Sequence, residues 1–222
     1  MMSRFPQSPG TRGSQKWVQQ FVNERPGALD GLVLKHIPNS SGIEWLSPLA
    51  SDNFAEYRDG AFLERLGISD LAGELADFWP TRGPQWDALG RMDKGDLLLV
   101  EAKAHISEVY SPRIQAGDIS RRKIEGAFRR TIASLGAKPC APWTDVFYQY
   151  ANRLAHLHFL RTMQGRSAWL VFVYFVGDAD MEGPTTEGEW RAALQVVKHV
   201  MGLSKRDGLS NFVLEVFPVV DS

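Results

Sequence analysis

The stretch that decides the fold is residues 84–105, which reads PQWDALGRMDKGDLLLVEAKAH. Two largely apolar segments flank the polar turn Asp93-Lys94-Gly95, and this pattern is typical of a β-hairpin. A three-residue hairpin loop needs a residue in the left-handed conformation near its end, and Gly95 stands where that conformation falls. The stretch therefore predicts two neighbouring antiparallel strands joined at residues 93–95.

The register of this hairpin decides which side chains lie together. A three-residue loop pairs Met92 with Asp96, and counting outward places Asp87 directly opposite Glu101. Lys103 lies two residues beyond Glu101, so it projects from the same face of the sheet. This loop therefore predicts two carboxylates and one ammonium group on a single patch.

A shorter loop would change this outcome. A two-residue loop alters the register, and pairing Asp87 with Val100 would place the carboxylates of Asp87 and Glu101 on opposite faces of the sheet. The sequence leaves this choice open.

The second strand of the hairpin is apolar up to its charged end. Residues 97–100 are Leu-Leu-Leu-Val, without polar alternation, which indicates a strand buried on both faces. Charges at the end of such a strand must be paired, neutralised or bound to a metal. Mg²⁺ is commonly held by one or two carboxylates with water and substrate phosphate. Asp87 and Glu101 are therefore candidate metal ligands, and Lys103 could orient or deprotonate a metal-bound water or stabilise transition-state charge.

Asp87, followed on the next strand by Glu101-Ala102-Lys103, resembles the PD-(D/E)XK superfamily of restriction-endonuclease-like nucleases. The resemblance implies an α/β fold with a restriction-endonuclease-like core, in which helices flank a mixed central β-sheet. It implies that Asp87 and Glu101 bind Mg²⁺ or Mn²⁺ together with the backbone carbonyl of Ala102. It further implies that Lys103 serves the nucleophilic water.

The first part of the motif departs from the family pattern. Pro84 stands three residues before Asp87, and Trp86 stands immediately before it. Because Glu-x-Lys on its own is common, the competing interpretation is a structural salt bridge at a strand end, in which Lys103 pairs with Glu101 or Asp87.

Nucleases of this kind often present a further carboxylate to the metal from a helix before the hairpin. The sequence predicts helices over residues 52–66 and 70–79, with Ser51 and Ser69 as N-caps. Among the carboxylates of these helices we favour Glu56, and the other candidates are Asp59, Glu64 and Glu74.

A basic helix is predicted after the hairpin, over residues 121–135. Its cationic side chains are Arg121, Arg122, Lys123, Arg129 and Arg130. Three of them, Arg122, Arg129 and Arg130, fall near one helical side and could follow a phosphate backbone beside the metal site. The alternative is a solvated face with local salt bridges, for example to Glu125.

The remaining segments predict the rest of an α/β domain. Strands are expected over residues 31–37, 43–46, 168–177 and 211–219, and helices over 144–163 and 187–201. Thr186 and Glu189 form a capping box for the last helix. The segment YQYANR within 144–163 could contact the active site, or it could simply belong to a helix docked on the sheet. A strand–helix–strand unit after the hairpin implies parallel pairing, so the sheet is expected to be mixed.

Composition sets the class of protein. The chain has 222 residues, of which 44% are hydrophobic and 23% charged, as in a globular domain. We expect a flexible tail over residues 1–13 and a single nuclease-like domain over 14–222. The lone cysteine, Cys140, excludes an internal disulfide, and no segment is long and apolar enough to span a membrane. We therefore expect a cytoplasmic protein without a membrane partner.

The function predicted from the sequence is metal-dependent hydrolysis of phosphodiester bonds in DNA or RNA. The net charge of −1 does not by itself indicate binding of nucleic acid, so any such surface must be local. The alternative function is a non-catalytic binding or assembly module on the same scaffold. The sequence leaves the oligomeric state open, a homodimer included.

Overall fold

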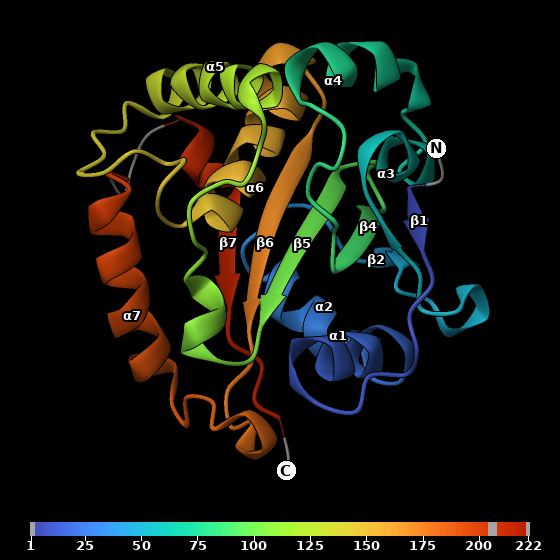
Figure 1. Cartoon of the computed structure of the whole chain (residues 1–222). Coiled ribbons are helices and arrows are strands. Elements are labelled where there is room, and N and C mark those ends of the chain that lie inside the picture. The colour runs from blue at the N-terminus through green and yellow to red at the C-terminus, as the bar shows by residue number, and fades with distance from the viewer. Residues whose placement is uncertain (1–2, 204–207, 221–222) are drawn as a thin grey trace.

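A mixed β-sheet forms the centre of the molecule (Figure 1). The computed structural model describes residues 3–203 and 208–220. Within these residues the main sheet has five strands in the order β2-β4-β5-β6-β7. β2, β4 and β5 are antiparallel neighbours, whereas β6 and β7 continue the sheet in parallel. The bounds are β2 Ile43–Ser47, β4 Ala88–Met92, β5 Leu97–Lys103, β6 Ala168–Tyr174 and β7 Val213–Val216. The predicted mixed sheet is confirmed.

Helices cover both faces of this sheet (Figure 1). Their bounds are α1 Gly13–Asn23, α2 Pro26–Leu34, α3 Asp59–Arg65, α4 Ala72–Phe78, α5 Asp118–Leu135, α6 Tyr148–His158 and α7 Glu187–Val200. α1 and α2 pack on one face through an apolar cluster that also contains Leu98 and Val100 of β5. α3 to α7 belong to a second cluster with Leu97 and Leu99. Strand β5 therefore alternates between two cores, which confirms that it is buried on both faces.

The hairpin has the predicted three-residue loop. The Met92 N–H donates to the Asp96 carbonyl at 2.8 Å, and Ala88 pairs with Val100. Gly95 has a φ of +88°, the left-handed conformation that the loop requires. Because Ala88 rather than Asp87 is opposite Val100, the alternative two-residue loop is excluded, and extending the register by one residue places Asp87 level with Glu101.

The crossovers of the parallel half are helical. α5 and α6 connect β5 to β6, and α7 connects β6 to β7. The capping box at the start of α7 is confirmed, with the Glu189 N–H donating to the Thr186 hydroxyl. The chain continues from α6 into a π-helical turn, Phe159–Met163. No helix of the described residues is long and apolar enough to cross a lipid bilayer.

Two segments differ from the sequence-based expectation. The strand expected over 31–37 is wrong, because Pro26 begins α2 and Leu29 and Val33 align on one buried helical face. The helix expected over 52–66 is interrupted by the two-residue strand β3 (Glu56–Tyr57), and only Asp59–Arg65 is helical. Positive φ angles at Asn53 and Asp59, where an α-helix needs negative ones, break the helix.

Residues 3–13, within the segment expected to be a tail, contact the rest of the domain. Strand β1 (Arg4–Phe5) pairs with β3 in antiparallel register, and Arg4 forms an ion pair with Asp52 at 2.6 Å. The Gly10 N–H donates to the Gln19 side chain at 2.7 Å. These contacts dock the segment on the domain, and residues 1–2 lie outside the described residues.

Candidate active site

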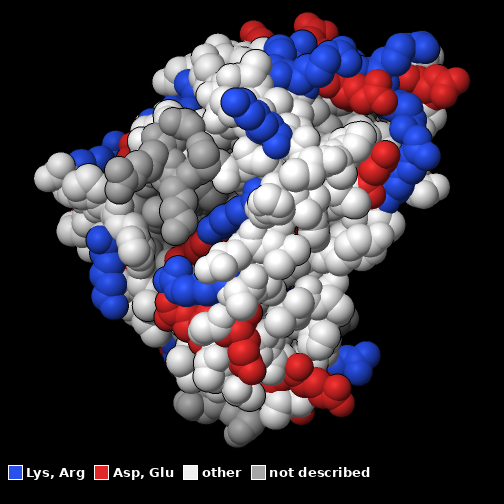
Figure 2. Space-filling model, turned by 90° about the vertical axis from the view of Figure 1, so that its left-hand side faces the viewer, with Lys and Arg blue, Asp and Glu red and all other residues white. Residues whose placement is uncertain are grey.

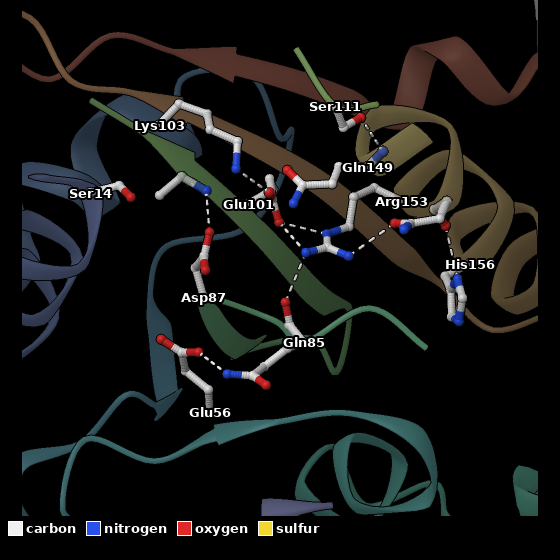
Figure 3. A network of polar contacts seen from close by, with 12 residues as sticks. Ser14, Glu56, Gln85, Asp87, Glu101, Lys103, Ser111, Gln149, Arg153 and His156 are labelled. Carbon is white, nitrogen blue, oxygen red and sulfur yellow. Dashed lines mark hydrogen bonds and ion pairs between the residues drawn. The ribbon is translucent and has the colours of Figure 1, made fainter. Parts of the chain in front are cut away.

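The three predicted side chains converge on one face of the sheet (Figure 3). Asp87 stands immediately before β4, and Glu101 and Lys103 end β5. Leu97 and Leu99, which precede them at alternate positions, belong to the apolar cluster beneath α5 and α6. The charged patch therefore continues the face that these helices cover.

Glu101 lies at the centre of this patch and is 3% exposed. Lys103 Nζ donates to its Oε1 at 2.5 Å, and Arg153 Nε donates to its Oε2 at 2.6 Å. A second guanidinium nitrogen of Arg153, Nη2, completes the ion pair. Burial alone would raise the pKa of Glu101, but the charges of Arg153 and Lys103 outweigh burial and lower it. Glu101 is therefore an ionised, fully paired carboxylate.

Asp87 has the opposite electrostatic environment. Its Oδ2 accepts a hydrogen bond from the Ala102 backbone N–H at 2.7 Å. Burial raises the pKa of Asp87 well above its ordinary value. Repulsion by the Glu101 carboxylate raises this pKa further, and this effect is larger than the lowering by the Lys103 ammonium group. Ionising Asp87 therefore calls for more positive charge than the protein itself supplies here.

The backbone carbonyl of Ala102 points toward the same side as Asp87. The Lys103 carbonyl accepts from the Phe175 N–H, on the β6 side, at 2.9 Å. Successive peptide groups of a strand point to opposite sides, so the Ala102 N–H and carbonyl both point away from β6. This direction agrees with the hydrogen bond from Ala102 to Asp87.

Lys103 is held as an ammonium ion. Burial alone would lower its pKa, but the carboxylates of Glu101 and Asp87 outweigh burial and raise it. With the proton retained, Lys103 is suited to donating hydrogen bonds rather than to acting as a base.

Glu56 lines the same cavity, although it belongs to β3 rather than to the expected helix. Gln85 Nε2 donates to its Oε2 at 2.5 Å. Burial raises the pKa of Glu56, and the charge of Glu101 adds to the effect, while the bond from Gln85 opposes it. The helix carboxylates Asp59, Glu64 and Glu74 do not line this cavity.

The main residue that the sequence analysis missed is Arg153 of α6, which is 5% exposed. Besides Glu101, its guanidinium donates to the Gln85 carbonyl at 2.8 Å and to the Asn152 side chain at 2.9 Å. It also lies over the Trp86 ring, 4.8 Å from the ring centroid. Arg153 thereby ties α6 to β5 and to the segment just before β4. The signal for it was the polar segment YQYANR, whose orientation the sequence had left open.

These side chains surround an open cavity of about 510 Å³. One wall comes from β3 and the loop before Asp87, and the other from α6 and the loop that follows β5. Its lining includes Glu56, Arg82, Gln85, Asp87, Glu101, Lys103, Ser111, Arg113, Gln115, Tyr148, Gln149, Asn152 and Arg153.

His156 supports the α6 wall from behind. It is buried next to the rings of Trp79 and Trp86, and its Nδ1 donates to the Asn152 carbonyl at 2.8 Å. Burial lowers the pKa of His156 to about 3, so its imidazole stays neutral. This histidine stabilises the helix and carries no proton to the cavity.

The basic residues predicted to contact nucleic acid lie on α5, and none of them lines this cavity. Lys123 Nζ donates to the Ala76 carbonyl at 2.6 Å, and the Arg130 guanidinium lies 5.3 Å from the Phe78 ring centroid. Figure 2 shows one face of the molecule, where basic and acidic groups are interspersed and basic groups are densest at the top, the level of α4 and α5. Contact between α5 and nucleic acid stays a prediction.

The donor chemistry of the cavity fits a hard divalent cation in part. Among residues 3–203 and 208–220, no group of three or more His, Cys, Asp or Glu side chains is arranged to hold a metal ion. Mg²⁺ needs fewer, since one or two carboxylates with waters and substrate oxygens suffice. Asp87, Glu101 and the Ala102 carbonyl are oxygen donors of that kind.

Comparison with known proteins does not assign this chain to a family. No protein-family model, curated protein or solved structure matches this chain.

Proposed function

We propose that this chain is a metal-dependent nuclease that hydrolyses phosphodiester bonds in DNA or RNA. The observation that carries the proposal is the hairpin register, which brings Asp87, Glu101 and Lys103 together at a polar cavity. The strand order supports it further: an antiparallel β2-β4-β5 half, a helical crossover and a parallel β6-β7 half resemble a restriction-endonuclease-like core.

Asp87, Glu101 and the Ala102 carbonyl would hold Mg²⁺ or Mn²⁺, with Glu56 as a further carboxylate of the same cavity. When bound, the metal would polarise the phosphate and lower the pKa of a coordinated water. The charge of the metal would also supply the positive charge that the ionised carboxylate of Asp87 needs beside it.

The protein's own cations take the other roles. Lys103, held as an ammonium, would orient the attacking water and stabilise the negative charge that develops on the phosphate oxygens. In the hydrolysis, the water oxygen forms a bond to phosphorus, one ester bond to phosphorus breaks, and the leaving oxygen takes up a proton. Arg153 keeps Glu101 ionised and fixed between β5 and α6.

The first prediction is that cleavage needs a divalent metal and Lys103. Labelled single- and double-stranded DNA and RNA would be incubated with wild-type protein and Mn²⁺; at least one of these substrates should be cut, and EDTA should stop the reaction. Lys103→Ala should lower the cleavage rate about 100-fold or more, the usual effect of removing one group that stabilises transition-state charge. The matched control is Lys35→Ala, which removes an exposed lysine at the end of α2, on the other face of the sheet. Equal cleavage by wild type and Lys103→Ala would refute the proposed chemistry.

One observation favours the second candidate function, a non-catalytic binding or assembly module. Lys103 and Arg153 already neutralise Glu101, as in a purely structural ion pair. Calorimetric titration with Mn²⁺ separates the two functions. Binding that Asp87→Ala abolishes supports the enzyme, whereas no heat of binding in the wild type supports the module.

A further inference from the structure

We propose that this cavity takes a single-stranded segment of nucleic acid, with one base stacked on Tyr110 and the adjoining phosphates between Arg82 and Arg113. The inference rests on the proposed function and narrows its substrate class.

The first argument is the shape of the cavity. Its volume of about 510 Å³ lies within the range of pockets that enclose a small organic molecule. Glu101 and Arg153 on its floor are only 3% and 5% exposed. A duplex keeps both backbones on a wide cylinder, with a major groove about 12 Å across. A single strand can bend so that its phosphate enters a recess of this size.

The second argument is the number of cations. Four basic residues line the cavity: Arg82, Lys103, Arg113 and Arg153. Lys103 and Arg153 are paired with Glu101, which leaves Arg82 and Arg113 at the rim as the more exposed cations. Tight binding to a duplex commonly rests on about six to ten phosphate contacts. The few cations of this cavity are enough to contact the phosphates of a short single-stranded segment of nucleic acid, but not those of a duplex.

The third argument is an exposed aromatic ring beside the cavity. Tyr110 is 60% exposed, and it is the only aromatic residue among the exposed large hydrophobic residues in the described part of the chain. Its ring packs edge-on against Phe147, with centroids 6.4 Å apart. The next residue, Ser111, lines the cavity and accepts a hydrogen bond from the Gln149 N–H of α6 at 2.9 Å.

Tyr110 thus immediately precedes the cavity-lining segment that starts at Ser111, and most of its ring stays open to solvent. Aromatic rings of this kind bind single strands by stacking, which contributes about 1–3 kcal/mol per base and tolerates any base. Arg113, three residues further along, lines the cavity and is the cation that we assign to the neighbouring phosphate. Its pairing with Asp145 at 3.2 Å is solvent-exposed and therefore weak.

Fluorescence anisotropy tests the inference directly. A labelled DNA strand of about a dozen nucleotides, the RNA strand of the same sequence and their duplexes would be titrated with wild-type protein in EDTA, where cleavage is prevented. We expect at least one single strand to bind about 10-fold or more tightly than its duplex. Tyr110→Ala should weaken this binding about 5- to 150-fold, the equivalent of one lost stack.

Two further variants make the test specific. Tyr110→Phe keeps the ring and should bind like the wild type. Val196→Ala removes exposed apolar surface from α7, where the side chain has the same 60% exposure, and should also bind like the wild type.

The outcomes also separate this inference from the proposed function. Duplex binding as tight as single-strand binding, or unchanged binding by Tyr110→Ala, would overturn the inference. If the protein nevertheless cuts duplex with Mn²⁺, the nuclease function stands and only the substrate class is wrong. If it neither binds nor cuts any of the strands, both fail.

Discussion

At the scale of single residues, the site is a set of unequal charges. Glu101 has two cations on its carboxylate, while Asp87 has one backbone N–H and a raised pKa. A carboxyl group kept in an unfavourable environment lowers the stability of the folded protein. Carboxyl groups with a strongly raised pKa are most often found at functional sites, where the ionised carboxylate is needed for function and not for folding.

The second prediction concerns the pH dependence that follows from Asp87. The pKa of Asp87 in the folded protein lies above its ordinary value of 3.8. Its contribution to stability is therefore present at low pH and is lost as the pH rises from about 4 through the raised pKa. In EDTA at pH 7, Asp87→Asn removes the free-energy cost of ionising this buried carboxyl group. For each kcal/mol of that cost, Tm should rise by about 2–4 °C. The difference in Tm between Asp87→Asn and the wild type should disappear below about pH 4, where residue 87 is uncharged in both proteins. A lower Tm for Asp87→Asn at pH 7 would contradict the raised pKa.

The third prediction concerns Arg153. Breaking a buried ion pair by removing one partner costs about 3–5 kcal/mol, because the other charge stays buried. Arg153→Gln should therefore lower the free energy of unfolding in urea by about that amount. The double variant Arg153→Gln, Glu101→Gln should recover part of the loss, because it removes the orphaned charge.

The matched control for Arg153 is an ion pair on the surface. Arg166 pairs with Asp70, and these side chains are 41% and 60% exposed. Arg166→Gln should cost less than about 1 kcal/mol, as exposed pairs do. Equal losses for Arg153→Gln and Arg166→Gln would show that the contact with Glu101 contributes little to stability.

At the scale of elements, the hairpin β4-β5 and helix α6 build the site between them. The loop at Gly95 decides which residues of β4 and β5 are opposite one another, and α6 then contributes Gln149, Asn152 and Arg153. A register shift of one residue would move the side chains of one strand to the other face. The site therefore depends on one turn more than on any single functional side chain.

The fourth prediction tests this turn. At Gly95, φ is +88° and nothing lies within 4 Å of an added Cβ, so only backbone strain opposes a side chain. Gly95→Ala should lower the free energy of unfolding by about 1–2 kcal/mol. Gly126→Ala is the control, because it lies within α5 and its Cβ would meet only arginine side chains, at 3.8 Å or more. It should be neutral or stabilising by up to about 1 kcal/mol. Equal effects of the two substitutions in urea unfolding would contradict the account.

At the scale of the whole molecule, the two faces of the sheet differ in polarity. The face under α1 and α2 is covered by an apolar cluster, while the other face is apolar under α5 to α7 and polar at the ends of β4 and β5. The net charge of −1 gives the molecule as a whole no long-range attraction for polyanions, and on the face in Figure 2 basic and acidic groups are interspersed. Any attraction for phosphate must therefore arise locally, and we assign it to Arg82 and Arg113 at the cavity.

From the sequence alone one could predict the hairpin and the two registers that its loop allows, and the structure selected the register in which Asp87, Glu101 and Lys103 share a face. These features depend on a glycine turn and on side-chain alternation, which are local. The capping box of α7 could be predicted for the same reason. In contrast, the tertiary structure alone decided that β1 docks on β3 and that Glu56 reaches the cavity from a strand. It also decided that Arg153 binds Glu101 across 52 positions of sequence. Such contacts depend on how separate elements pack, and no local pattern of residues encodes that packing.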